Sequence, residues 1–237
     1  MNGLLEYVRA EFQRLGSEHG RATTLRFHQP GQEVDSYGVR APEMHRLARE
    51  VYARVKKWPV KDRDRLCEVL WRSGKNEEGG VVCYVYRRFS KEFGAAHFGK
   101  FTRWLDRYVD NWGHTDGVSL WLLGVCILND ASLVAKLDSW TRSRDRWKRR
   151  AAAVSLIPSA KRGLHTAAIF RIAAPLITDP DDMVQKGVGW LLKETYPKKP
   201  RETVRFLLPW RASAPRLVLR YTTEKMTAAH RATILAR

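Results

Sequence analysis

The sequence predicts an all-helical chain in which short helices pack side by side. Apolar residues recur at intervals of three and four through most of its 237 residues, which is the spacing of one helix face. No alternating strand pattern interrupts them, and most connections between them are short. A repeat is also visible, because a step of 37 residues joins Trp112, Arg149 and Lys186. These observations favour a HEAT-like α-solenoid of about twelve helices in antiparallel pairs, forming a concave surface.

The register of this repeat is open by one residue. A step of 36 aligns Leu120, Leu156 and Leu192 better than a step of 37 does. With either step, the stacked helices would bring indoles, one carboxylate and several cations to the same surface.

The predicted helices follow one another along the whole chain. The first has its apolar face at Leu4, Leu5, Val8, Phe12 and Leu15. The second begins at Pro42, a residue that suits a first helical turn, and has its apolar face at Met44, Leu47, Val51 and Val55. The later apolar segments are residues 66–71, 81–89, 98–109, 118–128, 151–156, 167–177, 183–192, 204–208 and 217–219.

Glycine and proline separate these segments, and the breaks fall at Gly31, Gly38, Pro59, Gly74, Gly94, Pro158, Gly163, Pro180 and Pro197. The long connection is residues 29–40, a loop that could contact a ligand. Because no shift in composition marks a boundary, we expect a single domain over residues 1–237.

The charge of the chain is strongly positive and unevenly distributed. The net charge is +18, and the apolar fraction of 44% excludes a disordered chain. Residues 131–237 hold 22 Lys and Arg against 8 Asp and Glu, a net of +14, whereas residues 1–130 hold 21 against 17, a net of +4. Such an asymmetry points to nucleic acid or to an anionic membrane surface.

Three cysteines, Cys67, Cys83 and Cys126, stand among apolar neighbours without metal-ligand spacing, which predicts buried free thiols in a reducing compartment. The first apolar segment contains Glu6 and Arg9, so it is unlike a signal peptide. The longest largely apolar run, residues 118–128, is too short to span a membrane. We therefore expect a cytoplasmic, nucleoid-associated protein, and a monomer.

Trp112 and Asp116 are the first candidate site residues. They are four positions apart and so share a helix face, in a polar segment that precedes an apolar helix. The structural alternative is a core indole beside a capping or ion-paired carboxylate.

A second candidate segment, residues 142–150, holds six cations in nine residues, among them Arg146, Lys148, Arg149 and Arg150. Six like charges repel one another, which favours a polyanionic partner over a solvated face.

A third segment places Lys186 and Trp190 on one helix face, which Lys193 continues. Gly187 and Gly189 each cost about 1 kcal/mol in a helix, so a close approach by a backbone or a ligand is expected there. Trp190 could instead pack into the next repeat. Arg40, in a turn that leads into a helix, could reach a phosphate.

Several motifs are missing. The sequence has no Walker-type phosphate loop, no His-Glu-x-x-His, no cysteine pairs and no Gly-x-Ser-x-Gly. A nucleotide hydrolase, a metalloenzyme and a serine hydrolase are therefore disfavoured.

Four motifs together resemble the AlkD-type DNA alkylation-repair glycosylases: Tyr37-Gly-Val-Arg-Ala-Pro42, Trp112-x-x-x-Asp116, Trp147-x-x-Arg150-Ala-Ala and Gln185-Lys-x-x-Gly-Trp190. The resemblance covers nearly the whole chain, in order and at matching spacing. It implies a superhelix that wraps duplex DNA and excises positively charged N3- or N7-alkylated purines, with no metal and no organic cofactor. It also implies that Trp112, Asp116, Arg150 and Trp190 surround the lesion. Gly113 and His114 depart from the pattern of some relatives, which puts the substrate range in doubt.

The chemistry of the residues agrees with this implication. An alkylated purine already carries a positive charge, so it can leave without a general acid, and one carboxylate could suffice where other glycosidases need two. Asp116 would stabilise the sugar cation and orient the water. Trp112 and Trp190 would lie against the sugar or the cationic base. The DNA phosphates would be held by Arg40, Arg146, Lys148, Arg149, Arg150, Lys186 and Lys193.

Two other function classes remain open. One is a non-catalytic DNA-binding protein in which Asp116 is misplaced for chemistry. The other is an α-solenoid that binds acidic proteins through its basic surface.

Overall fold

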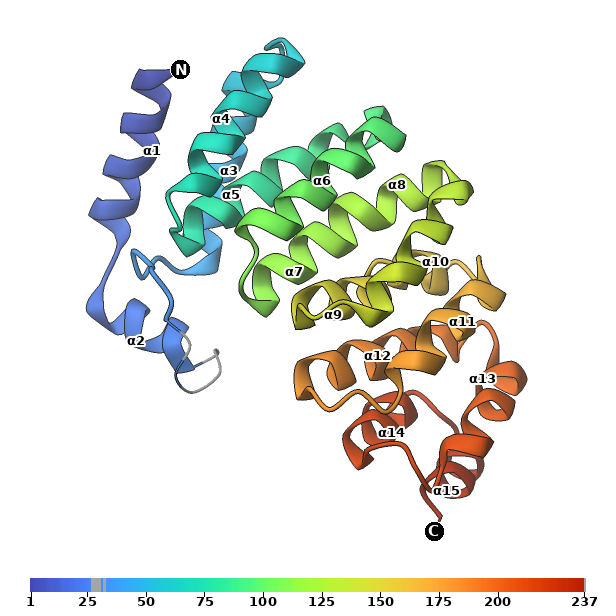
Figure 1. Ribbon diagram of the computed structural model, residues 1–237. Coiled ribbons are helices and arrows are strands. Elements are labelled where there is room, and N and C mark those ends of the chain that lie inside the picture. The colour runs from blue at the N-terminus through green and yellow to red at the C-terminus, as the bar shows by residue number, and fades with distance from the viewer. Residues whose placement is uncertain (27–30, 32, 237) are drawn as a thin grey trace. The chain divides into compact units, whose positions relative to one another are not determined.

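The computed structural model describes residues 1–26, 31 and 33–236 of the chain. Over these residues its regular structure is entirely helical (Figure 1). The chain forms two compact units. Unit 1 comprises Met1–Glu92 and Arg107–Gly117, and unit 2 comprises Phe93–Asp106 and Val118–Arg237. The single domain expected over residues 1–237 stays a prediction.

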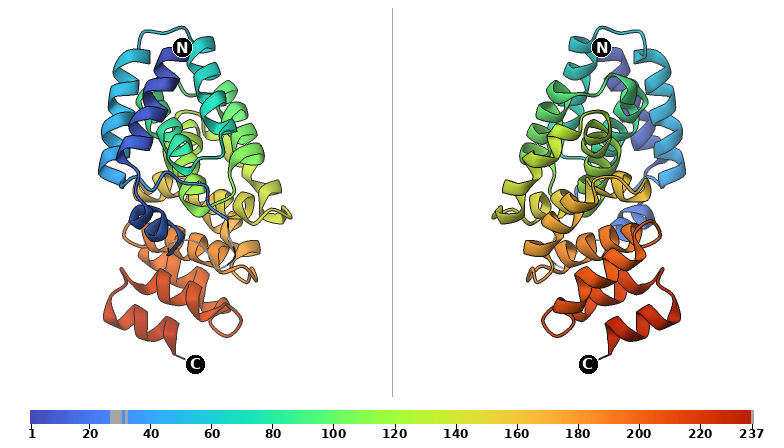
Figure 2. Two further views of the ribbon diagram at one scale, coloured as in Figure 1. Left: turned by 90° about the vertical axis from the view of Figure 1, so that its left-hand side faces the viewer. Right: turned by 90° about the vertical axis from the view of Figure 1, so that its right-hand side faces the viewer.

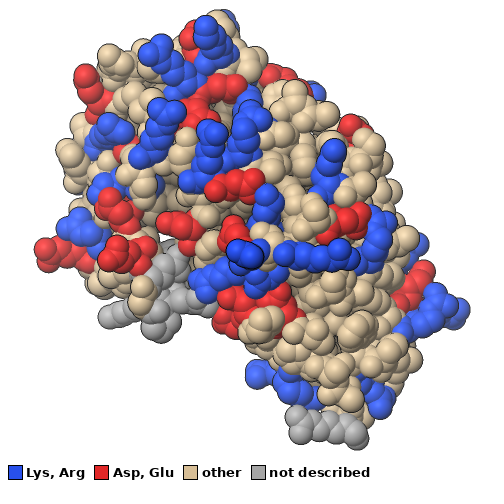
Figure 3. Space-filling view, in the orientation of Figure 1, with Lys and Arg blue, Asp and Glu red and all other residues tan. Residues whose placement is uncertain are grey.

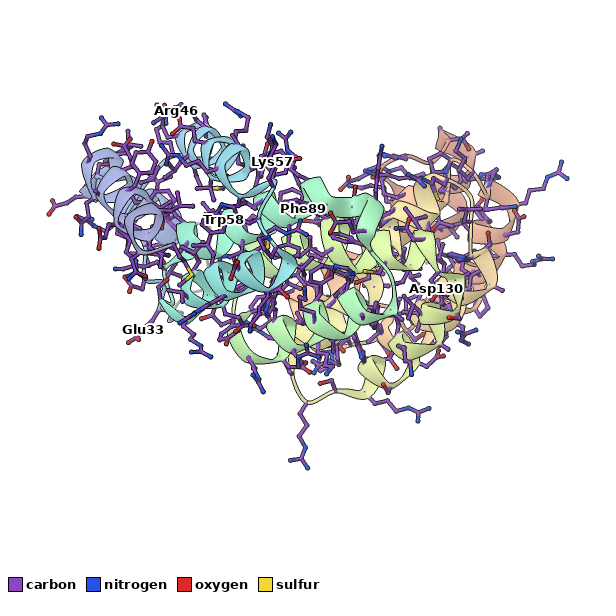
Figure 4. The ribbon with its side chains drawn as sticks, turned by 90° about the horizontal axis from the view of Figure 1, so that it is seen from above. Glu33, Arg46, Lys57, Trp58, Phe89 and Asp130 are labelled. Carbon is purple, nitrogen blue, oxygen red and sulfur yellow. The ribbon has the colours of Figure 1, made fainter. Side chains whose placement is uncertain are left out.

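Unit 1 is built from the N-terminal helices. They are α1(Asn2–Leu15), α2(Glu18–Arg26), α3(Ala41–Val55), α4(Val60–Arg72), α5(Asn76–Tyr86) and the 3₁₀ segment η1(Arg87–Glu92). α3 packs against both α1 and α5, and α4 packs against α5. Phe12, Leu47 and Val81 are fully buried in this packing. On the outer side of α3, Arg46 lies 2.7 Å from Glu50 and 3.7 Å from Glu11, so it joins α3 to α1 (Figure 4).

The middle of the chain contains one long helical stretch with a local irregularity. α6(Ala95–Tyr108) precedes it, and α7(Trp112–Val118) passes without a gap into η2(Ser119–Leu123) and α8(Gly124–Asn129). η2 is π-helical, which adds a residue to the turn and is frequent near functional sites.

Unit 2 continues with paired helices. These are η3(Ala131–Arg142), α9(Arg146–Val154), α10(Ile157–Lys161), α11(Thr166–Leu176), α12(Asp182–Thr195), α13(Pro200–Leu207), η4(Leu208–Trp210), α14(Arg216–Thr223) and α15(Ala228–Leu235). In one layer α9 packs on α12 and α12 packs on α14, while in the other η3 packs on α11 and α13 packs on α15 (Figures 1 and 2). Within this unit, helix pairs repeat along two layers, which confirms the predicted all-α solenoid.

The predicted apolar segments lie largely in helices, with Val109, Leu156 and Ile177 just beyond helix ends, and the number of helices among the described residues is larger than twelve. Irregular turns divide some stretches that the sequence pattern treats as one, as in residues 81–89, which the structure divides into α5 and η1. The division between α9 and α10 lies beside Pro158, where the sequence predicts a break. The short polar helix α2 was not predicted, because it carries no apolar stripe. Of the predicted loop over residues 29–40, Gln29, Pro30 and Gln32 lie outside the described residues.

The helix starts decide the register of the repeat. Asp145 caps α9 by accepting a hydrogen bond from Trp147 N at 2.8 Å, and Asp181 caps α12 in the same way, from Met183 N at 2.9 Å. These equivalent caps are 36 residues apart, so the step of 36 is correct between α9 and α12. The step of 37 is wrong there, because it aligned a residue one position away from its equivalent.

The three cysteines are buried and free, as the sequence predicts. Burial raises the pKa of the Cys83 and Cys126 thiols to about 12. No helix within the described residues is long and apolar enough to cross a membrane.

Candidate functional site

In unit 1, α7 begins at Trp112, and Asp116 follows one turn later. Asn111 holds this start, because its Oδ1 accepts from His114 N at 2.9 Å and its backbone oxygen accepts from Thr115 N at 3.0 Å. Asn111 and Thr115 are buried, whereas Trp112 and Asp116 are partly exposed. The structure therefore places the indole and the carboxylate on one face of a firmly capped helix turn, outside the fully buried core.

In unit 2, Arg149 is held by its own chain. Its Nε and Nη2 donate to the two carboxylate oxygens of Asp179 at 2.7 and 3.2 Å. Its Nη1 donates to the backbone oxygens of Ser143 and Arg144 at 2.9 and 3.1 Å. The hydrogen bond to Asp179 raises the pKa of Arg149. Because these donors are already used, Arg149 is suited to joining α9 to the segment that precedes α12.

Arg150 lies beside α12. This residue is 5% exposed, and its Nη1 donates to the backbone oxygen of Met183 at 2.5 Å. A Cβ at Gly187 would lie 3.2 Å from Arg150 Cγ, so this glycine leaves room for the arginine to cross the helix. The glycine that the sequence analysis found costly therefore serves packing between α9 and α12.

The second glycine of α12, Gly189, also allows a close packing contact. A Cβ at Gly189 would lie 2.6 Å from Tyr221 Cβ and 3.2 Å from the backbone oxygen of Val218. Gly189 thus lets α14 approach α12 closely. Trp190, the next residue of α12, is partly exposed.

The remaining predicted DNA-binding cations of unit 2 have carboxylate neighbours. Lys186 lies 2.8 Å from Asp182, Lys193 lies 2.8 Å from Glu224, and Lys148 lies 2.7 Å from Asp106. Arg146 lies 3.2 Å from Asp181 and over the ring of Trp147. Figure 3 shows that basic and acidic side chains alternate over the face of the molecule in that view.

In unit 1, Arg40 differs from these cations. It is the N-cap residue of α3 and it is exposed. Among the described residues, its side chain has no carboxylate partner.

The helix starts bring out an equivalence that the sequence analysis missed. Counting from the first residue of each helix, Asp116 is fifth in α7, Arg150 fifth in α9, Lys186 fifth in α12 and Arg220 fifth in α14. One helix position therefore carries a carboxylate in the first of these helices and a cation in each of the others. A fixed repeat length cannot align these four positions, because the helices begin at residues 112, 146, 182 and 216, which are 34, 36 and 34 residues apart.

Among the residues that the structure describes, no group of three or more His, Cys, Asp and Glu side chains could hold a metal ion.

An all-α solenoid with cations at a repeated helix position defines a class of protein suited to a polyanionic partner. More particularly, the chain belongs to the family of DNA alkylation repair enzymes, whose family model matches residues 8–226. Among solved structures it is similar to a predicted DNA alkylation repair enzyme from Enterococcus faecalis, with a TM-score of 0.78. The two are 14% identical, over 90% of this chain and 97% of that one, so this likeness concerns the fold. A search of curated proteins finds no match.

Proposed function

We propose that the protein is a DNA glycosylase that hydrolyses the N-glycosidic bond of positively charged N3- or N7-alkylated purines in duplex DNA. The observation that carries this proposal is the placement of Trp112 and Asp116 on one face of a capped helix turn, in a chain of the alkylation-repair family. A cationic purine needs no proton from the protein in order to leave. The protein has only to stabilise the positive charge that develops on the sugar, and to direct a water molecule.

Asp116 is the proposed catalytic residue. Its carboxylate would lie beside the sugar, stabilise the oxocarbenium-like transition state and accept a proton from the attacking water. The ring of Trp112 is on the same face and would offer its negative π-surface to the sugar or the cationic base. Trp190, which is partly exposed on α12, is proposed to contact the same substrate.

The basic residues of unit 2 are proposed to hold the phosphate backbone. Lys148, Lys186 and Lys193 each have a carboxylate partner that is 40 to 51% exposed. Exposed ion pairs contribute about 0–1 kcal/mol, so a phosphate could replace the carboxylate at little cost. Arg40, Arg146 and Arg150 remain proposed DNA contacts. For Arg149, the pairing with Asp179 supports an anchoring role better than a direct contact with DNA.

The test is a base-release assay on matched duplexes. Each contains a single N7-methylguanine, a single N3-methyladenine or only unmodified bases, and free base is measured under single-turnover conditions. We expect release from the two alkylated duplexes and none from the unmodified one. Salt-sensitive binding without release would indicate a non-catalytic DNA-binding protein. Weak, salt-insensitive binding would instead favour a protein-binding solenoid.

A further inference from the structure

The first turn of α5, residues 76–79, connects two parts of unit 1 that the proposed function uses. One is the loop that leads to Arg40, and the other is the start of α7 with Trp112 and Asp116. Neither connection is visible from the sequence motifs, because the partners are about 38 to 41 residues apart.

The loop is held by a buried carboxylate. Glu77 is 3% exposed, and its two oxygens accept from Ser36 Oγ at 2.7 Å and from the backbone nitrogens of Tyr37, Gly38 and Val39, each at 3.0 Å. A carboxylate that accepts several charge-assisted hydrogen bonds holds a loop more firmly than neutral contacts do.

The next residue strengthens this attachment. Glu78 is fully buried and accepts from Tyr37 Oη at 2.7 Å and from Arg9 Nε at 3.1 Å. Burial, together with the hydrogen bond to Glu78, raises the pKa of Tyr37. The loop also has no spare room, because a Cβ at Gly38 would lie 2.2 Å from the backbone oxygen of Ser17.

The start of α7 is held by His114. His114 is 7% exposed, with Nε2 2.8 Å from the backbone oxygen of Asn76 and Nδ1 3.0 Å from Asn111 Nδ2. A carbonyl accepts only, so Nε2 carries the proton and donates, and Nδ1 accepts from the Asn111 amide. Trp71 packs edge-on against this ring with centroids 5.1 Å apart.

Gly79 makes this arrangement possible. A Cβ there would lie 2.6 Å from the Trp71 ring and 2.7 Å from both Cε1 and Nε2 of His114. Both rings are buried, so neither can move aside at little cost. By contrast, a Cβ at the neighbouring Gly80 would meet the flexible end of Met44, at 3.2 Å from Cε.

We propose that His114 is a positioning residue, which packs against Gly79 in the first turn of α5 and thereby fixes the orientation of Asp116 for base release. Glu77, in the same turn, fixes the conformation of the loop that carries Arg40. This inference rests on the proposed glycosylase function. The departure at His114 that the sequence analysis noted would then be a structural determinant of the catalytic turn.

The test compares two adjacent substitutions in one helix, Gly79→Ala and Gly80→Ala. Both replace a glycine of α5 by a better helix former, but only Gly79→Ala collides with His114. We expect single-turnover base release to fall roughly 10- to 100-fold for Gly79→Ala, as misplacement of a catalytic group by about 1 Å does. The affinity of Gly79→Ala for undamaged duplex and the activity of Gly80→Ala should stay at the wild-type level. Equal base-release rates for the two variants would overturn the proposal.

A second pair of variants covers the case in which Gly79→Ala does not fold. His114→Ala removes the hydrogen bond to Asn76, whereas His114→Gln can restore it through its amide nitrogen. We expect His114→Gln to recover most of the rate that His114→Ala loses. No recovery in a stably folded Gln variant would contradict the positioning role. If the wild type releases no base from any alkylated duplex, the proposed function itself has failed, and this result is distinct from either comparison.

An independent observation concerns cations of unit 2 outside the predicted segments. Within the described part of the chain, no carboxylate pairs with the cations near the ends of α10 and α12, which are Lys161, Arg162, Lys198 and Lys199, nor with Arg201 in the first turn of α13. The two turns that carry them touch, since a Cβ at Gly163 would lie 3.5 Å from Lys198 Cβ. Residues 157–178 contain no Asp or Glu at all.

This cluster contrasts with the ion-paired lysines of α9 and α12. Lys161 can be explained as a cation near a helix C-terminus, but Lys198 and Lys199 lie beyond the end of their helix. Clustered cations without neighbouring carboxylates repel one another, and a bound anion relieves this repulsion. We infer that these two turns, which we name the basic turns, form a contact surface for the phosphate backbone of DNA.

The test measures how the affinity for undamaged duplex depends on salt. The triple variant Lys161→Gln, Arg162→Gln, Lys198→Gln is compared with Arg14→Gln, Arg171→Gln, Lys225→Gln, which removes the same charge from positions that belong neither to the basic turns nor to the proposed DNA contacts. Each lost phosphate contact lowers the log–log slope by about 0.9, so the first variant should lose about 2 to 3 units of slope and the control close to none. Equal slopes would overturn the inference. Loss of binding to polyglutamate with an unchanged DNA slope would overturn it too, in favour of an acidic protein partner.

Discussion

The first turns of α7, α9 and α12 are built in the same way, but they carry different side chains. In each, a capping residue fixes the first turn, by Asn111, Asp145 and Asp181 respectively. The fifth residue of the helix is Asp116 in α7, but Arg150 and Lys186 in the other two. The repeat therefore supplies equivalent positions, and in the proposed function the side chain decides whether a position binds phosphate or acts on the sugar.

The surroundings of these positions differ as well. Lys186 faces an exposed acid on its own helix, at 2.8 Å, whereas Arg150 is nearly buried against Met183 and Gly187. Asp116 stands on a turn whose orientation is set by buried polar contacts of His114. A rigidly held turn suits Asp116, because in the proposed function its carboxylate must be positioned against a reacting atom. An exposed ion pair that can rearrange suits Lys186, because its proposed partner is a phosphate.

The largest effect is expected at the carboxylate. Asp116→Asn keeps the shape of the side chain but removes the negative charge that would stabilise the sugar cation. We expect single-turnover base release to fall by about 10²–10³-fold, the usual result of losing preorganised charge stabilisation. Base release at the wild-type rate would remove Asp116 from the mechanism, and failure of the variant to fold would mark it as a structural carboxylate.

The next largest effect is a difference in the free energy of unfolding between substitutions of Arg149 and Lys186. Arg149→Ala leaves Asp179, whose side chain is 6% exposed, without its bidentate partner. We expect the free energy of unfolding to fall by about 2–3 kcal/mol, somewhat less than for a fully buried pair. The control is Lys186→Ala, an exposed pair that should cost less than about 1 kcal/mol. Chemical denaturation of both variants measures this, and similar losses would contradict the anchoring role of Arg149.

Trp190 tests whether α12 contributes to the site. Removing a core indole costs about 3–5 kcal/mol, but Trp190 is partly exposed. We therefore expect Trp190→Ala to cost only about 1–2 kcal/mol of stability and to weaken binding and excision of the lesion. Thermal unfolding paired with single-turnover excision measures both effects. A large fall in Tm with normal chemistry in the folded fraction would make Trp190 structural.

The smallest effects concern single lysines. Neutralising about five phosphates predicts a log–log slope of affinity against salt of about −4 to −5 for the wild type. Lys186→Gln and Lys193→Gln should each reduce the slope by about one unit, for all DNA sequences alike, because phosphate contacts carry no base information. A wild-type slope near zero would exclude nucleic acid as the main partner.

Much of this architecture could be predicted from the sequence. Apolar spacing located the main helices, since each must bury one stripe against its neighbours. The short polar helix α2 and the breaks within long helices could not be predicted, because propensity and capping, rather than an apolar stripe, decide them. The sequence left the register open by one residue, because the starts of the equivalent helices are 34, 36 and 34 residues apart.

The candidate site residues were predicted from short motifs, and for several of them the structure shows contacts that favour a structural role. The sequence cannot show that Arg149 is occupied by Asp179, thirty residues away. Nor can it show that Gly187 and Gly189 make room for Arg150 and Tyr221. Glu77 was overlooked, and His114 was noted only as a departure from the family pattern, because their partners are distant in sequence and a buried carboxylate or imidazole has no local signature.

The central claim is that equivalent positions divide the work, with the carboxylate of α7 acting in chemistry and the cation of α12 in binding. The most direct measurement determines both the single-turnover base-release rate and the Kd for an N7-methylguanine duplex, with Asp116→Asn and Lys186→Gln side by side. Each variant neutralises one charge at the fifth position of its helix with little change of shape. The account predicts that Asp116→Asn loses rate at an unchanged Kd, while Lys186→Gln weakens Kd at a nearly unchanged rate. If both substitutions change the same parameter, the division of work does not exist.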